Sequence, residues 1–365
     1  MSGDKSEPIR RAIEVEYWVI DDEGRLVEPG ALVEASAGAE REFVEPMLEI
    51  KTTPCESRAE LRTELLDRIA DVLRAADDLG KGLVPLGTTV NTDQIQEIPS
   101  ERTRIQNSVI GEDFEYVRHC AGTHIHIEQL PGREIDQLNT LIALDPALAL
   151  VNSSPYFGGE RIANGARSKL YRWTAYDNLP HQGRLWPYAD DTAEWTHRLE
   201  QRYEEFVTAA VNAGVDRQAV VSSFDPESAI WTPVQLREAF GTVEWRSPDT
   251  ALPSQVLQLA EQMVAIVARL EDAQVRIEGD MGDVTEEGIV IPEFDEVLEY
   301  VTAAIQDGVA SDAVRSYLDR MGFDVGAYKP VSQEIDGRGP VTPEEARRLR
   351  LKYAARLEQD VFDEK

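Results

Sequence analysis

Ile13-Glu14-Val15-Glu16 lies in an alternating stretch, from about Ala12 to Ile20, that predicts the first strand of this chain. Side chains on a strand alternate between its two faces, so Glu14 and Glu16 would share one face and the apolar residues beside them the other. The apolar face would pack on a core, which leaves the two carboxylates on the opposite side of a sheet. An acidic pair on a solvated strand face remains the alternative interpretation of these two residues alone.

Two further segments carry polar side chains at the same two-residue spacing. They are Gly122-Thr123-His124-Ile125-His126 and Thr242-Val243-Glu244-Trp245-Arg246. Both are predicted strands, so His124 and His126 would share a face, as would Glu244 and Arg246. Because the chain has five histidines in all, two on one strand face make a ligand role a serious alternative to a role in the core. For Glu244 and Arg246 the alternative is a cross-strand ion pair.

A fourth acidic segment runs from Glu42 to Glu49 and includes Glu45. Glu49 lies between two apolar residues of a predicted extended segment, so it is the best ligand candidate of the three. Glu42 is expected in the preceding loop, and Pro46 makes a regular strand around Glu45 doubtful. If the strand is buried, an unpartnered Glu49 would carry a large desolvation cost; simple alternation with Glu49 facing solvent is the other possibility.

The composition excludes several classes of partner. A formal net charge of −31 opposes binding to nucleic acid or to anionic membranes, and no apolar stretch is long enough for a membrane span. Lysine is scarce and acidic residues are spread along the chain, which favours a protein adapted to high salt over one with an acidic tail. The N-terminus lacks the apolar run of a secretory signal, so a cytoplasmic location is expected. Cys55 and Cys120 are expected to be reduced and buried.

The order of predicted elements favours the α+β class. Ser57 is expected to cap a helix that ends at Leu79, with Glu60 completing a capping box. Pro146 should divide a helical pattern over 136–151. The other expected elements are an unpatterned region over 94–116, helices over 195–213, 232–240, 254–277, 294–305, 313–321 and 343–359, and an extended segment over 228–231. Residues 1–252 are predicted to form the catalytic core, and residues 253–365 a mostly helical part packed on the same domain.

A basic cluster stands out in so acidic a chain. It contains Arg161, Arg167, Lys169 and Arg172. These side chains could neutralise phosphates or substrate carboxylates. Surface cations paired with neighbouring acids would give the same pattern, so both interpretations stay open.

Carboxylates with few thiols suit hard cations such as Mg²⁺ or Mn²⁺, which often accompany a nucleotide phosphate. Zinc would require further cysteine or histidine ligands at suitable spacing. The four segments therefore indicate an enzyme that uses ATP and Mg²⁺, with Mn²⁺ as the alternative metal.

Taken in order, these segments, with Asn152-Ser153-Ser154-Pro155-Tyr156, resemble the glutamate–cysteine ligase superfamily. The resemblance is to its carboxylate–amine ligase branch and to the glutamate–cysteine ligases of halophilic archaea, and it covers roughly residues 10–250. It implies a glutamine-synthetase-like catalytic fold, in which an antiparallel sheet forms a half-barrel with packed helices and its concave face holds Mg²⁺ and ATP.

The resemblance also implies roles for individual residues. The implied metal ligands are Glu14, Glu16, Glu42, Glu49, His124 and Glu244. Arg246 is implied to contact phosphate or the acyl substrate, which with Glu49 makes it a catalytic candidate. Lys169 and Arg172 are the candidates for contact with the nucleotide, although the segment around them matches no family pattern.

The implied reaction is ATP-dependent formation of an amide. The γ-carboxylate of L-glutamate would be phosphorylated, and the amine of L-cysteine would displace phosphate to give γ-glutamylcysteine. One alternative is a ligase with another acid or amine, because metal motifs do not encode the amine. A second is a catalytically silent binding protein on the same scaffold. The expected partners are small molecules, with neither nucleic acid nor membrane among them.

Overall fold

The computed structural model describes residues 8–92, 94–285, 288–337 and 339–364. Its largest sheet is antiparallel, with strand order β2-β3-β1-β5-β9-β8 and with β4 also paired to β1. The strands are β1 (Arg11–Asp21), β2 (Ala39–Arg41), β3 (Met47–Lys51), β4 (Lys81–Val84), β5 (Thr123–Glu128), β8 (Val234–Arg237) and β9 (Thr242–Trp245). The N-terminal residues on which the expectation about a secretory signal rests lie outside the described residues.

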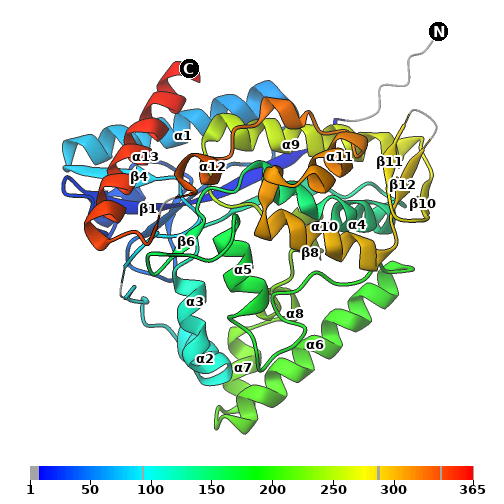
Figure 1. Cartoon of the computed structure of the whole chain (residues 1–365). Helices are drawn as coiled ribbons and strands as arrows, with labels where there is room; N and C mark the ends of the chain where they lie inside the picture. The colour runs from blue at the N-terminus through cyan, green and yellow to red at the C-terminus, as the bar shows by residue number, and fades with distance from the viewer. Residues whose placement is uncertain (1–7, 93, 286–287, 338, 365) are drawn as a thin grey trace.

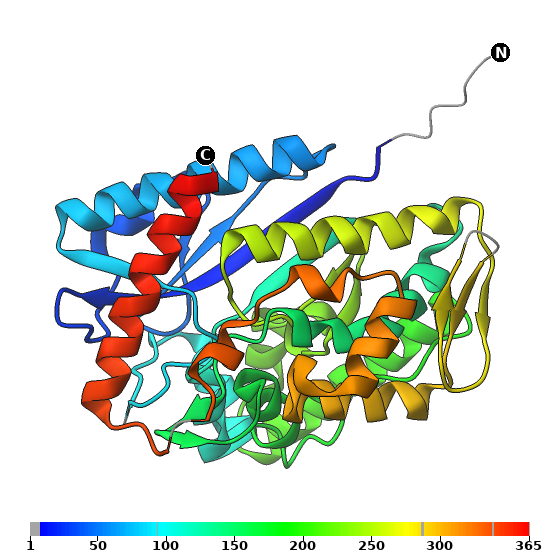
Figure 2. The same ribbon diagram turned by 45° about the horizontal axis from the view of Figure 1, so that its top comes forward.

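Strand β1 separates an apolar layer from a polar one. Ile13, Val15 and Tyr17 are fully buried, whereas Glu14 and Glu16 between them are partly exposed. Helices α1 (Arg58–Asp78), α9 (Pro253–Ala268) and α13 (Pro343–Glu364) contact one another and gather on one side of the sheet (Figure 1, Figure 2). The predicted alternation of β1 is confirmed, and it turns the two carboxylates away from the apolar layer.

Local signals set the ends of α1. The Ser57 side chain accepts a hydrogen bond from the backbone N–H of Glu60, as predicted for an N-cap. The Glu60 carboxylate accepts from the backbone N–H of Glu56, one residue before the cap, so the predicted capping box is not closed on Ser57 itself. Gly80 follows the helix with φ of 62°, the left-handed conformation that favours glycine.

The remaining helices lie mostly on the other side of β1 in Figure 1. They are α2 (Glu101–Ile110), α3 (Phe114–Arg118), α4 (Glu134–Ala143), α5 (Ala166–Trp173), α6 (Thr192–Asn212), α7 (Arg217–Ser223), α8 (Pro226–Ala229), α10 (Phe294–Gln306), α11 (Asp312–Arg320) and α12 (Val331–Ile335). A 3₁₀ helix over Asp145–Leu150 follows α4, so the division expected at Pro146 is confirmed. A short β6–β7 hairpin (Tyr156–Phe157 and Glu160–Arg161) precedes α5.

Three local predictions are wrong. Residues 234–237 form strand β8 instead of a helix, because pairing with β9 outweighs the helix-start signal of Thr232 and Pro233. Of the segment 228–231 that was expected to be extended, Ser228 and Ala229 instead end α8, which Asp225 caps, whereas Ile230 is extended. Helix α2 begins within the region expected to lack periodicity, where Ser100 and Thr103 form a capping box.

The C-terminal part is not wholly helical. Helix α9 ends at Ala268, nine residues before the predicted end, and a small sheet follows it. This sheet contains β10 (Val275–Ile277), β11 (Asp283–Val284) and β12 (Ile289–Ile291). One apolar cluster includes side chains from both sides of residue 252, among them Ile13 and Val361. The division into two parts at residue 252 stays a prediction.

Among the residues described, no helix combines the length and the apolar character that crossing a membrane requires.

Candidate functional site

Strand register brings the acidic and imidazole side chains onto one face of the sheet. Glu14 on β1 lies opposite His124 on β5, and Glu16 lies opposite Glu49 on β3. His126 on β5 in turn lies opposite Glu244 on β9. Directly opposed residues point to the same face, so residues from four strands converge there.

The converging side chains form a row of three donor groups. In each group one donor atom per residue lies within 4.8 Å of the others; the groups are Glu14–His126–Glu244, Glu14–Glu49–His124 and Glu16–Glu42–Glu49. We call these the outer, central and inner groups. The outer and central groups share Glu14, and the central and inner groups share Glu49. Every predicted metal ligand belongs to one of the three groups, although only a bound metal would test that role.

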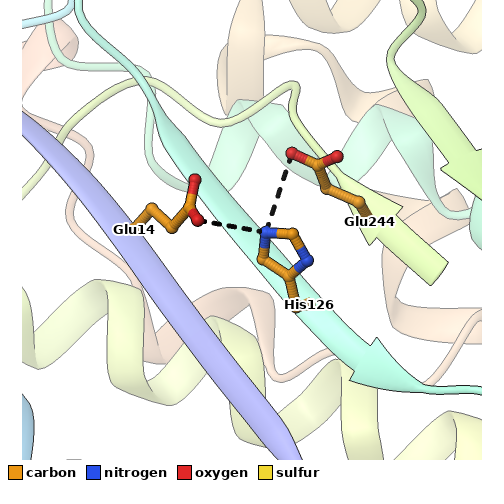
Figure 3. A group of neighbouring side chains, drawn as sticks. All are labelled: Glu14, His126 and Glu244. Atoms are coloured by element: carbon orange, nitrogen blue, oxygen red, sulfur yellow. Dashed lines mark ion pairs between the residues drawn. The ribbon is translucent and has the colours of Figure 1, made fainter. Parts of the chain in front are cut away.

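In the outer group the imidazole nitrogen and the carboxylate oxygens are farther apart than in a hydrogen bond. His126 Nε2 lies 3.6 Å from Glu14 Oε1 and 3.7 Å from Glu244 Oε1 (Figure 3). His124 Nδ1 lies between the same two residues, 3.3 Å from Glu14 Oε2 and 3.4 Å from Glu244 Oε1. His124 is therefore within hydrogen-bond distance of Glu14, whereas His126 Nε2 points at both carboxylates from beyond that distance.

The donor set fits a divalent cation. His126 Nδ1 lies 3.2 Å from the Thr242 hydroxyl oxygen, a contact that orients the ring. His126 Nε2 is buried, and among the described residues it has no hydrogen-bond partner. A cation shared with Glu14 and Glu244 would satisfy this nitrogen, and carboxylate-rich sites with one imidazole suit Mg²⁺ or Mn²⁺.

The inner group carries more negative charge than its surroundings can stabilise. Burial raises the pKa of Glu49 well above its usual range, and the Glu42 and Glu14 carboxylates raise it further. Burial and the nearby Glu16 carboxylate raise the pKa of Glu42 to about 7. Without a metal ion, Glu42 would therefore hold a proton that a metal ion would displace. Glu49 is opposed in the same way by burial and by its acidic neighbours, but the Lys51 ammonium 2.7 Å away favours its carboxylate form.

In the outer group the carboxyl pKa values are lowered, in contrast to those of the inner group. Burial would raise the pKa of Glu244, but Arg246, His124, His126 and Arg237 outweigh it and lower this pKa to about 2. Burial also opposes ionisation of Glu14, whose pKa nevertheless falls far below its usual range because of its contacts with the two imidazoles. Both carboxylates of this group are thus ionised and ready to act as ligands.

Two arginines hold the Glu244 end of the row. Arg246 Nε lies 3.2 Å from Glu244 Oε1, and Arg237 donates to the other oxygen of the same carboxylate. The Arg246 guanidinium also lies over the Trp231 ring, 5.5 Å from its centroid. Both the functional interpretation of Arg246 and the alternative of an ion pair with Glu244 fit this geometry.

Arg237 and Lys51 on this face were not anticipated. Arg237 was missed because its segment was expected to be a helix. Lys51 lies two residues beyond Glu49 on β3, opposite Glu14, so strand alternation alone would have found it. His126 shares the predicted strand face with His124, but of the two the predicted ligand set contains only His124. Glu45 is exposed and belongs to none of the three groups.

The basic cluster is engaged elsewhere. The guanidinium of Arg172 is buried and bonded to both oxygens of Asp145, at 2.6 and 3.2 Å. Lys169 donates to the carbonyl of Ile162 at 2.8 Å, and Arg161 pairs with Asp336. Arg167 donates to the carbonyls of Arg246 and Ser247. Only Arg161 fits the alternative of a surface cation paired with an acid, because Arg167 and Arg172 are buried and Lys169 and Arg167 bond carbonyls. Contact of Lys169 and Arg172 with a nucleotide stays a prediction.

A cavity of about 320 Å³ lies beside the outer group. His126 and Thr242 belong to its wall, together with Phe240, whose ring meets the His126 imidazole edge-on at 5.9 Å. The Phe240 side chain is 62% exposed, an unusual position for a large apolar ring. The rest of the lining comprises Arg10, Arg11, Ala12, Pro54, Glu128, Gln129, Pro131, Glu134 and Gly241.

A family model described as glutamate–cysteine ligase family 2 (GCS2) matches residues 12–314, most of the chain and all of the row. The chain belongs to glutamate–cysteine ligase family 2. The predicted superfamily is thereby confirmed. Among curated relatives of this family 2 chain, a candidate glutamate–cysteine ligase 2-1 from Rhodococcus jostii is 26% identical over 251 residues, 66% of this chain and 62% of that protein.

The match to a relative from Haloferax volcanii covers a smaller part of the chain. A glutamate–cysteine ligase from Haloferax volcanii is 29% identical over 168 residues, which are 44% of this chain and 40% of that protein. The family 2 chain therefore covers less than two thirds of the length of either relative. The finer assignment to the ligases of halophilic archaea stays a prediction.

Two solved structures share the fold of this family 2 chain. Glutamate–cysteine ligase from Francisella tularensis, in complex with AMP, has a TM-score of 0.55 at 12% identity and covers 99% of this chain and 93% of its own. A bifunctional glutathione synthetase from Pasteurella multocida has a TM-score of 0.60 at 13% identity, covering 96% and 52%. The predicted α+β, glutamine-synthetase-like fold with an antiparallel sheet is confirmed.

Proposed function

We propose that this protein is an ATP-dependent carboxylate–amine ligase that joins the γ-carboxylate of L-glutamate to the amine of L-cysteine. The observation that carries the proposal is the row of three adjoining donor groups on one sheet face. Membership of glutamate–cysteine ligase family 2 supports it, as does the likeness to a ligase that binds AMP.

The row meets the main physical demand of this reaction. ATP and a substrate carboxylate are both anions, so they must be brought together against their mutual repulsion. Divalent cations, when bound, supply positive charge that neutralises phosphate oxygens and stabilises the transferring phosphoryl group. Glu14, His126 and Glu244 would hold one such ion, and the central and inner groups offer places for others.

The proposed reaction has two steps. A γ-carboxylate oxygen of glutamate attacks the γ-phosphorus of ATP, the bond to the bridging oxygen breaks, and ADP leaves with an acyl phosphate remaining. The nitrogen of the neutral amine then attacks the acyl carbon, the carbon–oxygen bond breaks, phosphate leaves and the nitrogen loses a proton. The substrate carboxylate is itself phosphorylated, so neither step requires a nucleophile from the protein.

Arg246 is placed to stabilise the transferred charge. Its guanidinium lies next to Glu244, and Arg237 holds the second oxygen of that carboxylate. These two contacts fix Glu244 but use only part of the Arg246 guanidinium. Its remaining N–H groups can bind phosphate or acyl oxygens. Arg246 is in this proposal a catalytic residue and Arg237 a positioning residue.

The cavity beside the outer group supplies space for the nucleoside of ATP. Its volume of about 320 Å³ lies at the lower end of the range of small-molecule pockets. Phe240 offers a ring on which a base can stack, and His126 joins this cavity to the outer group. A cytoplasmic location, where ATP and both amino acids are available, is part of the proposal.

The decisive experiment measures phosphate release from ATP with Mg²⁺ at high KCl, with glutamate plus cysteine and with each omitted. Release that requires both amino acids supports the proposal. Release with glutamate alone would indicate an acyl phosphate whose natural acceptor is another amine. No release in any mixture would contradict the ligase assignment for these substrates and favour a silent scaffold or another acid.

A further inference from the structure

A lysine side chain lies among the carboxylates of the row. Lys51 on β3 is paired with Glu14 on β1, so its side chain points to the same face as the donor groups. Its ammonium nitrogen lies 2.7 Å from Glu49 Oε2. Because Glu49 belongs to both the central and the inner group, this cation is bonded to a carboxylate that two groups share.

Lys51 also has a second carboxylate partner outside the row. Its ammonium nitrogen lies 3.1 Å from Glu40 Oε2 on β2, the strand at the edge of the sheet. Glu40 is directly opposite Glu49 in the β2–β3 register, yet its side chain is 60% exposed, whereas that of Glu49 is 5% exposed. The ammonium therefore bridges a buried carboxylate and an exposed one.

This bridge would affect how strongly a cation can bind. Both the ammonium and a divalent ion are cations that use lone pairs of Glu49, and a positive charge close to a divalent ion repels it. Lysine is well suited to giving up such a contact, since its charge is compact, readily hydrated and carried on a flexible stem. When a divalent ion binds Glu49, the ammonium can remain paired with the exposed Glu40 carboxylate.

We propose that Lys51 is an internal counter-ion that competes with the divalent cation of the inner group for Glu49 and moves toward Glu40 when that cation binds. This inference rests on the proposed function, because it requires that the inner group binds a metal ion. Lys51 would then determine how strongly the inner group binds its cation. Glu40, which is not a ligand, would affect this binding by attracting the Lys51 ammonium away from Glu49.

The arginines at the other end of the row do not offer the same exchange. Arg237 is bonded to Glu227 as well as to Glu244, and Arg246 also lies over Trp231. These contacts hold both guanidinium groups in place. Exchange between a side-chain cation and a metal ion is therefore proposed for Lys51 at the inner group and not for these arginines.

A Mn²⁺ titration of the metal-free protein, with free Mn²⁺ followed by electron paramagnetic resonance, tests the competition without requiring turnover. Lys51→Met should tighten one class of sites by about tenfold, which corresponds to ~1.4 kcal/mol. Glu40→Gln should weaken the same class by a smaller factor, because it removes the outer position of the ammonium. Lys81→Met is the matched control: its ammonium bonds the carbonyls of Glu28 and Pro29, so Mn²⁺ binding should not change.

The double variant Lys51→Met/Glu40→Gln separates direct competition from a general effect of charge. Under competition, Glu40 acts only through Lys51, so the double variant should bind Mn²⁺ as Lys51→Met does. Additive effects of the two changes would overturn the inference, as would unchanged binding by Lys51→Met. Wild-type protein that binds no Mn²⁺ at all would overturn the proposed cation sites together with this inference. Glu40 is exposed, so Glu40→Gln should fold normally. Its Mn²⁺ binding therefore tests the inference even if Lys51→Met folds poorly.

Discussion

His126 and Glu244 face each other across the β5–β9 strand pair, with Nε2 and Oε1 3.7 Å apart. That separation is too long for a hydrogen bond, but it suits two ligands of one ion. The sheet holds both side chains in this arrangement through backbone pairing, so the outer group is preformed.

Glu49→Gln should strongly reduce turnover while leaving the fold intact. The amide keeps the size of the side chain but is a poorer ligand for two of the donor groups, and a metal ion stabilises the transition state by several kcal/mol. We expect phosphate release to fall by about 100-fold or more. Glu45→Gln is the matched control, since Glu45 is exposed and outside the row, and it should retain wild-type activity. An active Glu49→Gln enzyme would remove Glu49 from the ligand set.

Cation binding should release protons near neutral pH. The pKa of Glu42 is raised from 4.5 to about 7 in the fold, so the folded metal-free protein holds a proton that the unfolded chain has lost. Its contribution to the free energy of unfolding is complete below pH 4.5 and is lost as the pH rises through about 7. Mg²⁺ should restore this stability, because it takes the place of the proton.

Calorimetric titration with Mg²⁺ at pH 6.5, in two buffers of different ionisation enthalpy, measures these protons. The apparent binding enthalpy should differ between the buffers, and Glu42→Gln should reduce the difference. Equal enthalpies in both buffers would show that Glu42 is already ionised in the metal-free protein.

Phe240→Ala should weaken the binding of ATP with little effect on the chemical step. The ring lies in the wall of the cavity beside the outer group and is not a ligand candidate. Loss of one stacking contact corresponds to about 1–3 kcal/mol, so the KM for ATP should rise roughly 5- to 150-fold with kcat changed much less. Phe240→Tyr should behave as wild type. An unchanged KM for ATP in Phe240→Ala would place the nucleoside elsewhere.

Arg172→Met should destabilise the protein. It would leave the fully buried Asp145 carboxylate without its cation, and breaking a buried pair costs about 3–5 kcal/mol. The urea midpoint should therefore fall clearly, whereas Lys169→Met, which removes one bond to a carbonyl, should cost about 1 kcal/mol or less. A raised KM for ATP in Arg172→Met, with unchanged stability, would instead support its predicted contact with the nucleotide.

The melting temperature should rise with KCl concentration. A net charge of −31 destabilises the compact state by self-repulsion, and the screening length falls from ~10 Å to ~3 Å between about 0.1 M and 1 M salt. Sucrose serves as a control for effects other than screening of charge. A melting temperature that did not respond to KCl would count against adaptation to salt.

The sequence was most informative where one strand carried its own pattern. Alternation predicted that Glu14 and Glu16 share a polar face, and the capping signal of Ser57 placed the start of α1 correctly. These features depend on neighbouring residues alone. Strand register is different: nothing local indicates that Glu14 lies opposite both His124 and Lys51, because that depends on which strands pair and at which offset.

The same limit explains the missed residue Arg237. Thr232 and Pro233 carry a sound local signal for the start of a helix, and pairing with β9 overrides it. Once this segment is a strand, Arg237 is carried to the carboxylate of Glu244. The site was therefore predictable in its ligand types and less so in the cations that surround them.

Because Glu14 and Glu49 each serve two neighbouring groups, the three groups cannot fill independently. An ion bound at one group withdraws electron density from the carboxylate that the next group needs, and it repels the next ion across a few ångströms. If the row binds metal ions as proposed, it would act as one polydentate chelator whose positions differ in affinity and fill in a set order. Weakly held ions at its last position would leave with the products, so that position would be emptied and refilled in each catalytic cycle.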